Sequence, residues 1–165
     1  MSDGDEVRLR EPRERVSPRA RLMWAAFDLL RGAVVMGFLL LTSGPWNWWH
    51  IPAWVLAGLA VLLLAYAVLV PLWRYRVHRW EVTDTAVYTQ TGWWARERRI
   101  APMSRVQTVD HREGAISRLF GLATVRITTA SSAGALTIEG LDQHRALDIV
   151  ENLTRVADSV PGDAT

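Results

Sequence analysis

The sequence predicts an α+β protein in which a two-helix transmembrane hairpin precedes a β-rich domain that ends in one α-helix. Two apolar stretches, residues 22–42 and 51–73, lie in the first half of the 165-residue chain. From residue 76 onward, apolar and polar residues alternate between turn residues, as in strands that bury one face. After Asp142 the apolar spacing changes to that of an amphipathic helix.

The first element is a polar tail. Residues 1–17 mix Arg with Asp and Glu and contain few apolar side chains. Such a segment buries too little apolar surface to offset the entropy lost on ordering it. We therefore expect residues 1–17 to form a disordered cytoplasmic tail.

The first apolar stretch, residues 22–42, has helix start and stop signals. Ser17 is a suitable N-cap with Pro18 at the first helical position, and Gly44-Pro45 ends the helix. The stretch is too long for a cleaved signal peptide, and no small-residue cleavage site precedes a soluble region. It predicts a first membrane span.

The second apolar stretch, residues 51–73, contains no charged side chain. A hydrocarbon core about 30 Å thick requires about 20 helical residues. A core helix of a small soluble domain would carry a polar face, and this stretch has none. With the short Trp-rich connection between them, the two spans form a transmembrane hairpin over residues 18–75.

Arginine placement predicts the orientation of this hairpin. Six arginines precede the first span and three follow the second, whereas the connection has neither Arg nor Lys. By the positive-inside rule, the chain is a multi-pass protein of the cell (cytoplasmic) membrane with both termini cytoplasmic. The arginines that set this topology after the second span are Arg74, Arg76 and Arg79. Tryptophans are expected to form two interfacial belts: Trp46, Trp48, Trp49 and Trp54 outside, and Trp24, Trp73 and Trp80 inside.

Composition narrows the function classes. The chain has no cysteine, which excludes disulfides, thiol catalysis and cysteine metal sites. All 19 residues counted as Lys or Arg are arginine, which, with the Ala, Val and Leu content, is typical of a GC-rich bacterial gene. A net charge of +2 does not predict nucleic-acid binding, although the pI is about 9.6. The four histidines lack metal-ligand spacing, and no nucleophile or phosphate-loop motif occurs. We expect no enzymatic activity, catalytic residue, metal, cofactor or small-molecule substrate.

The β-rich region is predicted to form one cytoplasmic domain over residues 76–158. Gly, Pro and Asp residues divide it into short strands with β-branched and aromatic residues. An irregular or helical connection is expected over residues 114–121 and a hairpin turn over residues 131–134. The expected strands are 77–83, 86–91, 93–100, 105–110, 122–129 and 135–139.

The last element is an amphipathic helix. Asp142 is a good N-cap, and apolar residues from Ala146 to Ala157 recur at helical spacing. This stripe is expected to pack across a sheet. Residues 159–165 are expected to be a disordered tail.

Six or seven short antiparallel strands capped by a C-terminal helix follow the plan of a pleckstrin-homology-like (PH-like) β-barrel or sandwich. Over about residues 20–157, the sequence resembles the bacterial PH domain of YdbS-like membrane proteins. The resemblance implies a membrane-anchored cytoplasmic PH-like module, with loose links to bacterial envelope stress or resistance and no established reaction. The segments that carry it are 75–83, 92–102, 105–109, 119–123 and 128–134.

A pair of arginines is a candidate for contact with anionic lipid head groups. Strand alternation places Arg96 and Arg98 on one face, about 7 Å apart, and guanidinium groups bind phosphate in a forked geometry. A solvated strand with alternating charges explains the same residues, and both readings stay open.

Asp28 and Arg31 are the polar exceptions within the first span. Their i,i+3 spacing allows an intrahelical pair, and ionisable residues in a membrane are candidate functional sites. A structural or inter-subunit pair is the alternative. Two spans per chain cannot enclose a pathway, so transport through them would require an oligomer.

One apolar cluster is expected to close an end of the barrel. Leu119, Phe120 and Leu122 flank Gly121, where the chain must turn into a strand. An exposed edge that binds a partner is the alternative.

Two functions from different classes follow. The first is a membrane-anchored interaction or scaffold module that recruits a protein partner at the inner face of the membrane or associates with itself. The second is an oligomeric lipid- or solute-handling membrane component that uses Asp28 and Arg31. In both, the lipid bilayer is a partner and nucleic acid is not.

Overall fold

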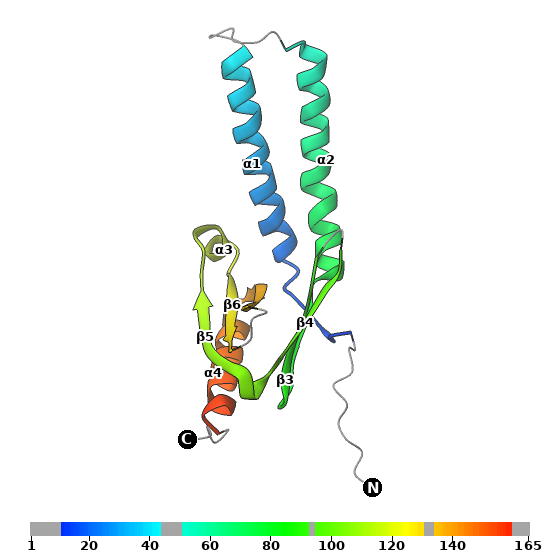
Figure 1. Ribbon diagram of the computed structural model, residues 1–165. Helices are drawn as coiled ribbons and strands as arrows, with labels where there is room; N and C mark the ends of the chain where they lie inside the picture. The colour runs from blue at the N-terminus through cyan, green and yellow to red at the C-terminus, as the bar shows by residue number, and fades with distance from the viewer. Residues whose placement is uncertain (1–10, 44–50, 93–94, 131–133, 160–165) are drawn as a thin grey trace.

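Two long helices project from a β-rich domain (Figure 1). The computed structural model describes residues 11–43, 51–92, 95–130 and 134–159, with side chains through residue 156. The helices are α1, Ala20–Ser43, and α2, Ala53–Val77, and they lie side by side as a hairpin. The predicted Trp-rich loop falls mostly on residues 44–50, outside the described residues.

Both helices are long and apolar enough to cross a membrane. Only 6% of the most apolar window of α1 and 11% of that of α2 is buried inside the protein. A core helix of a soluble protein would be largely covered, so this exposure fits side chains that face lipid. Helix α1 contains the predicted span 22–42, whereas α2 begins at Ala53, two residues after the predicted start at residue 51, and extends beyond the predicted end at residue 73.

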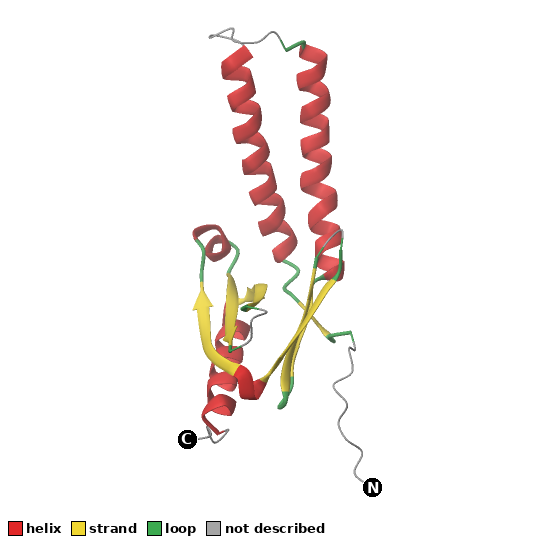
Figure 2. Ribbon diagram, in the orientation of Figure 1, coloured by secondary structure: helices red, strands yellow, loops and turns green. Residues whose placement is uncertain are grey.

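The domain contains two antiparallel sheets (Figure 2). Four strands in the order β1-β2-β3-β4 form one sheet, and three in the order β5-β6-β7 form the other. Helix α4, Gln143–Ser159, packs on the second sheet, and the short helices η1, Met103–Arg105, and α3, Ala115–Leu119, connect strands. The strands are β1, Glu14–Arg15; β2, Arg79–Val82; β3, Ala86–Thr91; β4, Glu97–Pro102; β5, Val106–Arg112; β6, Leu122–Thr129; and β7, Leu136–Asp142.

The arrangement is a sandwich-like α+β fold rather than a closed barrel. Strands β4 and β5, joined through η1, belong to different sheets, so among the described residues no ladder closes the ring. The predicted α+β class, the seven antiparallel strands and the C-terminal helix are confirmed.

Several expected boundaries differ from the structure: β4, for example, runs over Glu97–Pro102 and not 93–100, of which residues 93 and 94 lie outside the described residues. Two other differences have a clear physical cause. Helix α2 continues through Val77 before the strand β2 begins at Arg79, because the backbone N–H of His78 still donates to the Arg74 carbonyl (2.8 Å). Residues 11–17 are not a loose tail, because Glu14–Arg15 pair with β2 and so cover the edge of that sheet. Composition alone could not anticipate this pairing, since it depends on the edge that β2 offers.

The domain core includes the first turns of α1. Large side chains from both sheets and α4 are almost fully buried, and so are Ala20, Met23 and Trp24 of α1. Trp24 (4% exposed) and Trp80 (3% exposed) therefore belong to the core, and their expected place in an interfacial belt is wrong. Trp73 remains 48% exposed, as a belt residue would be.

The apolar cluster around Gly121 divides into buried and exposed members. Leu122 is 1% exposed and Phe120 packs against the core, whereas Leu119 is 84% exposed. The expectation that Leu119 closes the domain is wrong, because α3 ends at Leu119 and Gly121 (φ +65°) turns the chain only afterwards into the buried β6. Leu119 thus remains available on the surface.

Candidate functional site

The membrane hairpin and the β-rich domain are joined by direct packing rather than by a linker. The backbone N–H of Ser17 donates to the Gly140 carbonyl (2.8 Å), and the Ser17 hydroxyl donates to Asp142 Oδ1 (3.1 Å). The predicted cap residue Asp142 is the last residue of β7, and its carboxylate thus holds the segment that leads into α1.

Gly140 permits the closest approach at this junction. Its φ is +76°, and a Cβ added there would lie 2.6 Å from the Ala20 Cβ. Glycine is the residue that adopts this backbone conformation without strain, and here it also lets β7 touch α1. The packing fixes the direction in which α1 leaves the domain.

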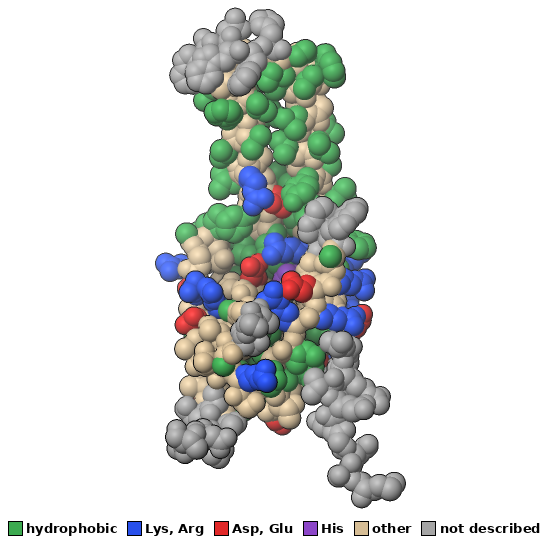
Figure 3. All heavy atoms as spheres, viewed as in Figure 1, with side chains coloured by type: hydrophobic (Ala, Val, Ile, Leu, Met, Phe, Trp, Pro, Cys, Tyr) green, Lys and Arg blue, Asp and Glu red, His purple; other side chains and the backbone are tan. Residues whose placement is uncertain are grey.

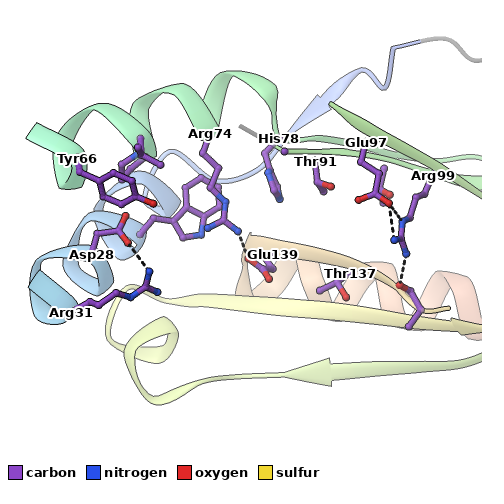
Figure 4. A pocket seen from close by; sticks show the side chains of 16 residues that line it. Asp28, Arg31, Tyr66, Arg74, His78, Thr91, Glu97, Arg99, Thr137 and Glu139 are labelled. Carbon is purple, nitrogen blue, oxygen red and sulfur yellow. Dashed lines mark hydrogen bonds and ion pairs between the residues drawn. The ribbon is translucent and has the colours of Figure 1, made fainter. Parts of the chain in front are cut away.

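A pocket of about 480 Å³ lies where the hairpin meets both sheets. Figure 3 shows the apolar surface of the hairpin above and charged side chains gathered below it. In the close view, Asp28, Arg31 and Tyr66 lie toward the hairpin, and Thr91, Arg99 and Thr137 lie toward the sheets (Figure 4). The pocket therefore runs from the helices into the space between β3, β4 and β7.

The charges that line the pocket are paired. Arg74 Nη2 lies 2.8 Å from Glu139 Oε2, and this pair joins α2 to β7. At the sheet end Arg99 Nη2 lies 2.7 Å from Glu97 Oε1. At the hairpin end Arg31 Nη1 lies 3.9 Å from Asp28 Oδ1. Among the described lining residues, three arginines face three carboxylates, so the formal charge of the pocket is balanced.

A second hollow of about 350 Å³ borders the same charges. It lies toward α3 and β6, with Ser117 and Thr124 among its lining residues. Both hollows are lined by Trp24, Asp28, Arg31, Arg74 and Glu139. The polar groups at the base of α1 are therefore reached from two sides.

Two aromatic side chains form a polar floor beneath Arg74. The Trp24 and His78 rings meet edge to face with centroids 5.3 Å apart, and the Arg74 Cζ lies 4.3 Å from the centre of the Trp24 ring. Within the part of the chain that the structure describes, Trp24 Nε1 and His78 Nδ1 are buried without a hydrogen-bond partner. An unsatisfied buried polar atom costs about 1–3 kcal/mol, so this is a place where a group from outside the chain would be stabilising.

The buried, neutral His78 is expected to make the protein less stable in mild acid. Burial, and then the positive charge of Arg74, lower the pKa of His78 from 6.5 to about 4. Because the unfolded chain binds a proton below pH 6.5 and the folded chain does not until about pH 4, stability is full above pH 6.5 and falls as the pH drops toward 4. We expect this residue to contribute up to about 3 kcal/mol of that loss.

Thermal unfolding of the full chain in detergent between pH 7.5 and 4.5 measures this effect. His78→Gln should flatten the dependence, whereas His144→Gln, at an exposed position of α4, should leave it unchanged. An equal slope in wild type and His78→Gln would contradict the assignment.

The structure brings together only some of the predicted site residues. Asp28, Arg31 and Arg74 line the pocket, whereas Arg96 and Arg98 do not. Arg98 donates to Glu11 Oε1 (3.1 Å), and Arg96 lies 4.0 Å from the same oxygen, so a carboxylate already faces this pair. Their contact with lipid head groups stays a prediction.

The other topology-setting arginines, Arg76 and Arg79, also lie outside the pocket lining. Arg76 is exposed and Arg79 is half-buried on β2. Arg74 has a second role in addition to setting topology, because it pairs with Glu139 and covers Trp24.

Sequence reasoning missed His78 and Glu139 as site residues. Both were expected on strands, His78 on 77–83 and Glu139 on 135–139, whereas the structure places His78 at the C-terminal end of α2 and Glu139 within β7. The charge of Glu139 is visible in the sequence. Its role beside Arg74 can be recognised only once β7 and α2 are packed together.

The arrangement is suited to binding a polar group at the base of two apolar helices. Among the described residues, no group of three or more His, Asp or Glu side chains is placed to hold a metal ion. Guanidinium and carboxylate groups instead offer charge-assisted hydrogen bonds to a ligand that carries the complementary groups.

The sequence has informative relatives. Residues 25–157 match the family described as the bacterial PH domain. The transmembrane protein YdbS of Bacillus subtilis (strain 168) is 33% identical over 155 residues, which cover 90% of this chain and 96% of that protein. No solved structure gives a significant match.

Proposed function

The chain belongs to the bacterial PH domain family, and from this premise we propose that it is a membrane-anchored interaction module. The family match and the two apolar helices make it a membrane protein that carries a PH-like domain. In the proposal, the hairpin holds the domain at the inner face of a bacterial cytoplasmic membrane, where it recruits or scaffolds a protein partner or a second copy of the chain.

The observation that carries this proposal is the packed junction. The start of α1 is part of the domain core, and the Ser17–Gly140 and Arg74–Glu139 contacts hold both helices to β7. The matched family region, residues 25–157, includes the Arg74–Glu139 part of this junction. A domain held in one orientation presents the same surface at all times, which lowers the ordering cost when a partner binds.

Photo-crosslinking in living cells tests the interaction role. A benzophenone amino acid is placed at exposed apolar positions of the domain, Leu119 (84% exposed) and Leu147 (49% exposed), and at Trp54 (77% exposed) near the far end of α2 as the control. We expect a protein adduct from a domain position that is absent from Trp54. The role is refuted if no domain position yields an adduct with a protein or with a second copy.

The proposed topology predicts a labelling pattern. Since the natural chain has no cysteine, single substitutions Asn47→Cys and Asp84→Cys report one site each. In intact spheroplasts, a membrane-impermeant maleimide should label position 47 at once and position 84 only after lysis, because the arginine distribution predicts that the domain is inside. Labelling of position 84 before lysis would reverse the orientation.

A second function, lipid or solute handling, is favoured by one specific observation. Asp28 and Arg31 line a pocket that continues into the domain. Asp28→Asn with Arg31→Gln should abolish such an activity while leaving partner recruitment intact. A double variant with unchanged phenotype and unchanged assembly would exclude this second function.

A further inference from the structure

We propose that the junction pocket binds the zwitterionic head group of a phospholipid that carries a phosphodiester and a primary ammonium, as phosphatidylethanolamine does. The inference deepens the second function above and rests on the membrane placement of α1 and α2. It does not depend on the scaffold role.

The position of the pocket favours a lipid over a soluble ligand. Asp28 lies eight residues beyond Ala20, or about 12 Å along α1, and Tyr66 lies the same number of residues before Arg74 on α2. The charge-free part of α2 ends at Trp73, so the pocket straddles the level at which the span ends. Above it, the hairpin exposes apolar side chains such as Val61 and Leu62, along which acyl chains can lie.

The charge of the pocket favours a zwitterion over an anion. An anionic head group would meet Asp28, Glu97 and Glu139, and a purely cationic one would meet the three arginines. A ligand with both charges can place its phosphate beside Arg74 and its ammonium beside Glu139, so that each charge of the ligand meets an opposite one. The primary ammonium matters because three N–H groups can donate to carboxylates, whereas a quaternary ammonium cannot donate.

The floor of the pocket supports a bound polar group. His78 is 5% exposed, lines the pocket, and points toward the region between Arg74 and Thr91 (Figure 4). Among the described residues its Nδ1 has no partner, and the same holds for Trp24 Nε1 next to it. These two nitrogens lack partners next to the Arg74–Glu139 pair, so a polar group that reached them would be stabilised.

Binding by the purified full chain in detergent tests the proposal. The probes are dioctanoyl phosphatidylethanolamine, the matching phosphatidylcholine and phosphatidylglycerol, and soluble glycerophosphoethanolamine, each titrated by native mass spectrometry and by thermal shift. We expect phosphatidylethanolamine to bind at least about tenfold more tightly than the other lipids. Weak binding of the soluble compound would show that the acyl chains contribute, whereas equal binding of it would overturn the assignment of a lipid.

A charge-neutral double variant tests the site. Arg74→Gln with Glu139→Gln removes both charges of the central pair and should lower affinity for phosphatidylethanolamine about tenfold or more. The matched control is Glu151→Gln with Arg155→Gln, an exposed i,i+4 pair on α4 at 2.9 Å, which should bind as wild type. Unchanged affinity in the Arg74/Glu139 variant overturns the proposal, and so does phosphatidylglycerol binding as tightly as phosphatidylethanolamine.

A variant that fills the pocket keeps the test decisive if the double variant does not fold. Thr137→Trp adds volume at a half-buried lining position of β7 and removes no charge. It should abolish binding while the protein remains in the membrane. Retained binding would place the lipid elsewhere on the chain, whatever partner the domain recruits.

Discussion

Gly140→Ala is expected to destabilise the protein by about 2–5 kcal/mol. The αL conformation costs a non-glycine residue about 1–2 kcal/mol, and the φ of Gly140 is +76°. The new Cβ would also lie 2.6 Å from the Ala20 Cβ, and both atoms are fixed to backbone. Relief requires α1 to move away from β7, and overpacking of this kind costs about 1–3 kcal/mol.

The substitution Gly134→Ala separates the cost of the αL conformation from the cost of the close contact with Ala20. Its φ of +79° matches that of Gly140, but a Cβ there would meet nothing within 4 Å. Gly134→Ala should therefore cost only the conformational part, about 1–2 kcal/mol. Denaturant unfolding of the full chain in detergent gives both values, and equal losses would show that the contact with Ala20 does not hold the junction.

Limited proteolysis adds a readout of the junction itself. Arg15 and Arg19 are exposed trypsin sites beside the segment that Gly140 holds through the Ser17 N–H. Faster cleavage there is expected in Gly140→Ala than in Gly134→Ala. If Gly140→Ala loosens the junction alone, cleavage at Arg15 and Arg19 should accelerate while cleavage elsewhere in the chain stays unchanged.

Much of the fold could be predicted because its signals are local. The absence of charge over residues 51–73 is a property of the sequence itself, and so are the alternation in Ala86–Thr91 and Leu122–Thr129 and the apolar stripe of α4. Each of these segments buries a face set by its own period. The strands β3 and β6 accordingly have the expected bounds.

The errors arose where an element depends on a distant one. Glu14–Arg15 become a strand only because β2 presents an edge, and Trp24 enters the domain core only because Gly140 lets β7 approach α1. Neither interaction can be predicted from the few residues on either side of Glu14–Arg15 or of Trp24. Tryptophan near the end of a span is as compatible with a lipid interface as with a protein core.

The candidate site could be predicted only in part, because local sequence signals mark some of its residues and not others. Asp28 and Arg31 stood out because charges are rare in a span. His78 and Glu139 did not, since each is ordinary in its own strand or helix end. The pocket exists because α1, α2 and β7 converge, and long-range packing of this kind is not encoded by local periodicity.

Trp24→Ala is expected to cost about 3–5 kcal/mol, the range for removing a large buried aromatic side chain. Trp24 is 4% exposed and packs in the domain core. Its ring also contacts the His78 ring and lies beneath the Arg74 guanidinium, both at the C-terminal end of α2. Trp54→Ala is the matched control, because that tryptophan is 77% exposed on α2. It should change domain stability by less than about 0.5 kcal/mol.

The two variants should also differ in which part of the protein they affect. The spans keep their backbone hydrogen bonds within each helix, so the helicity of α1 and α2 in detergent should survive Trp24→Ala. Hydrogen exchange in β6 and β7 should accelerate, because these strands share a core with the start of α1. Unchanged exchange in β7 would mean that the domain folds without the hairpin and that the junction is a tether. Acceleration in β7 with intact helices would instead establish that the first turns of α1 belong to the domain and set its orientation at the membrane.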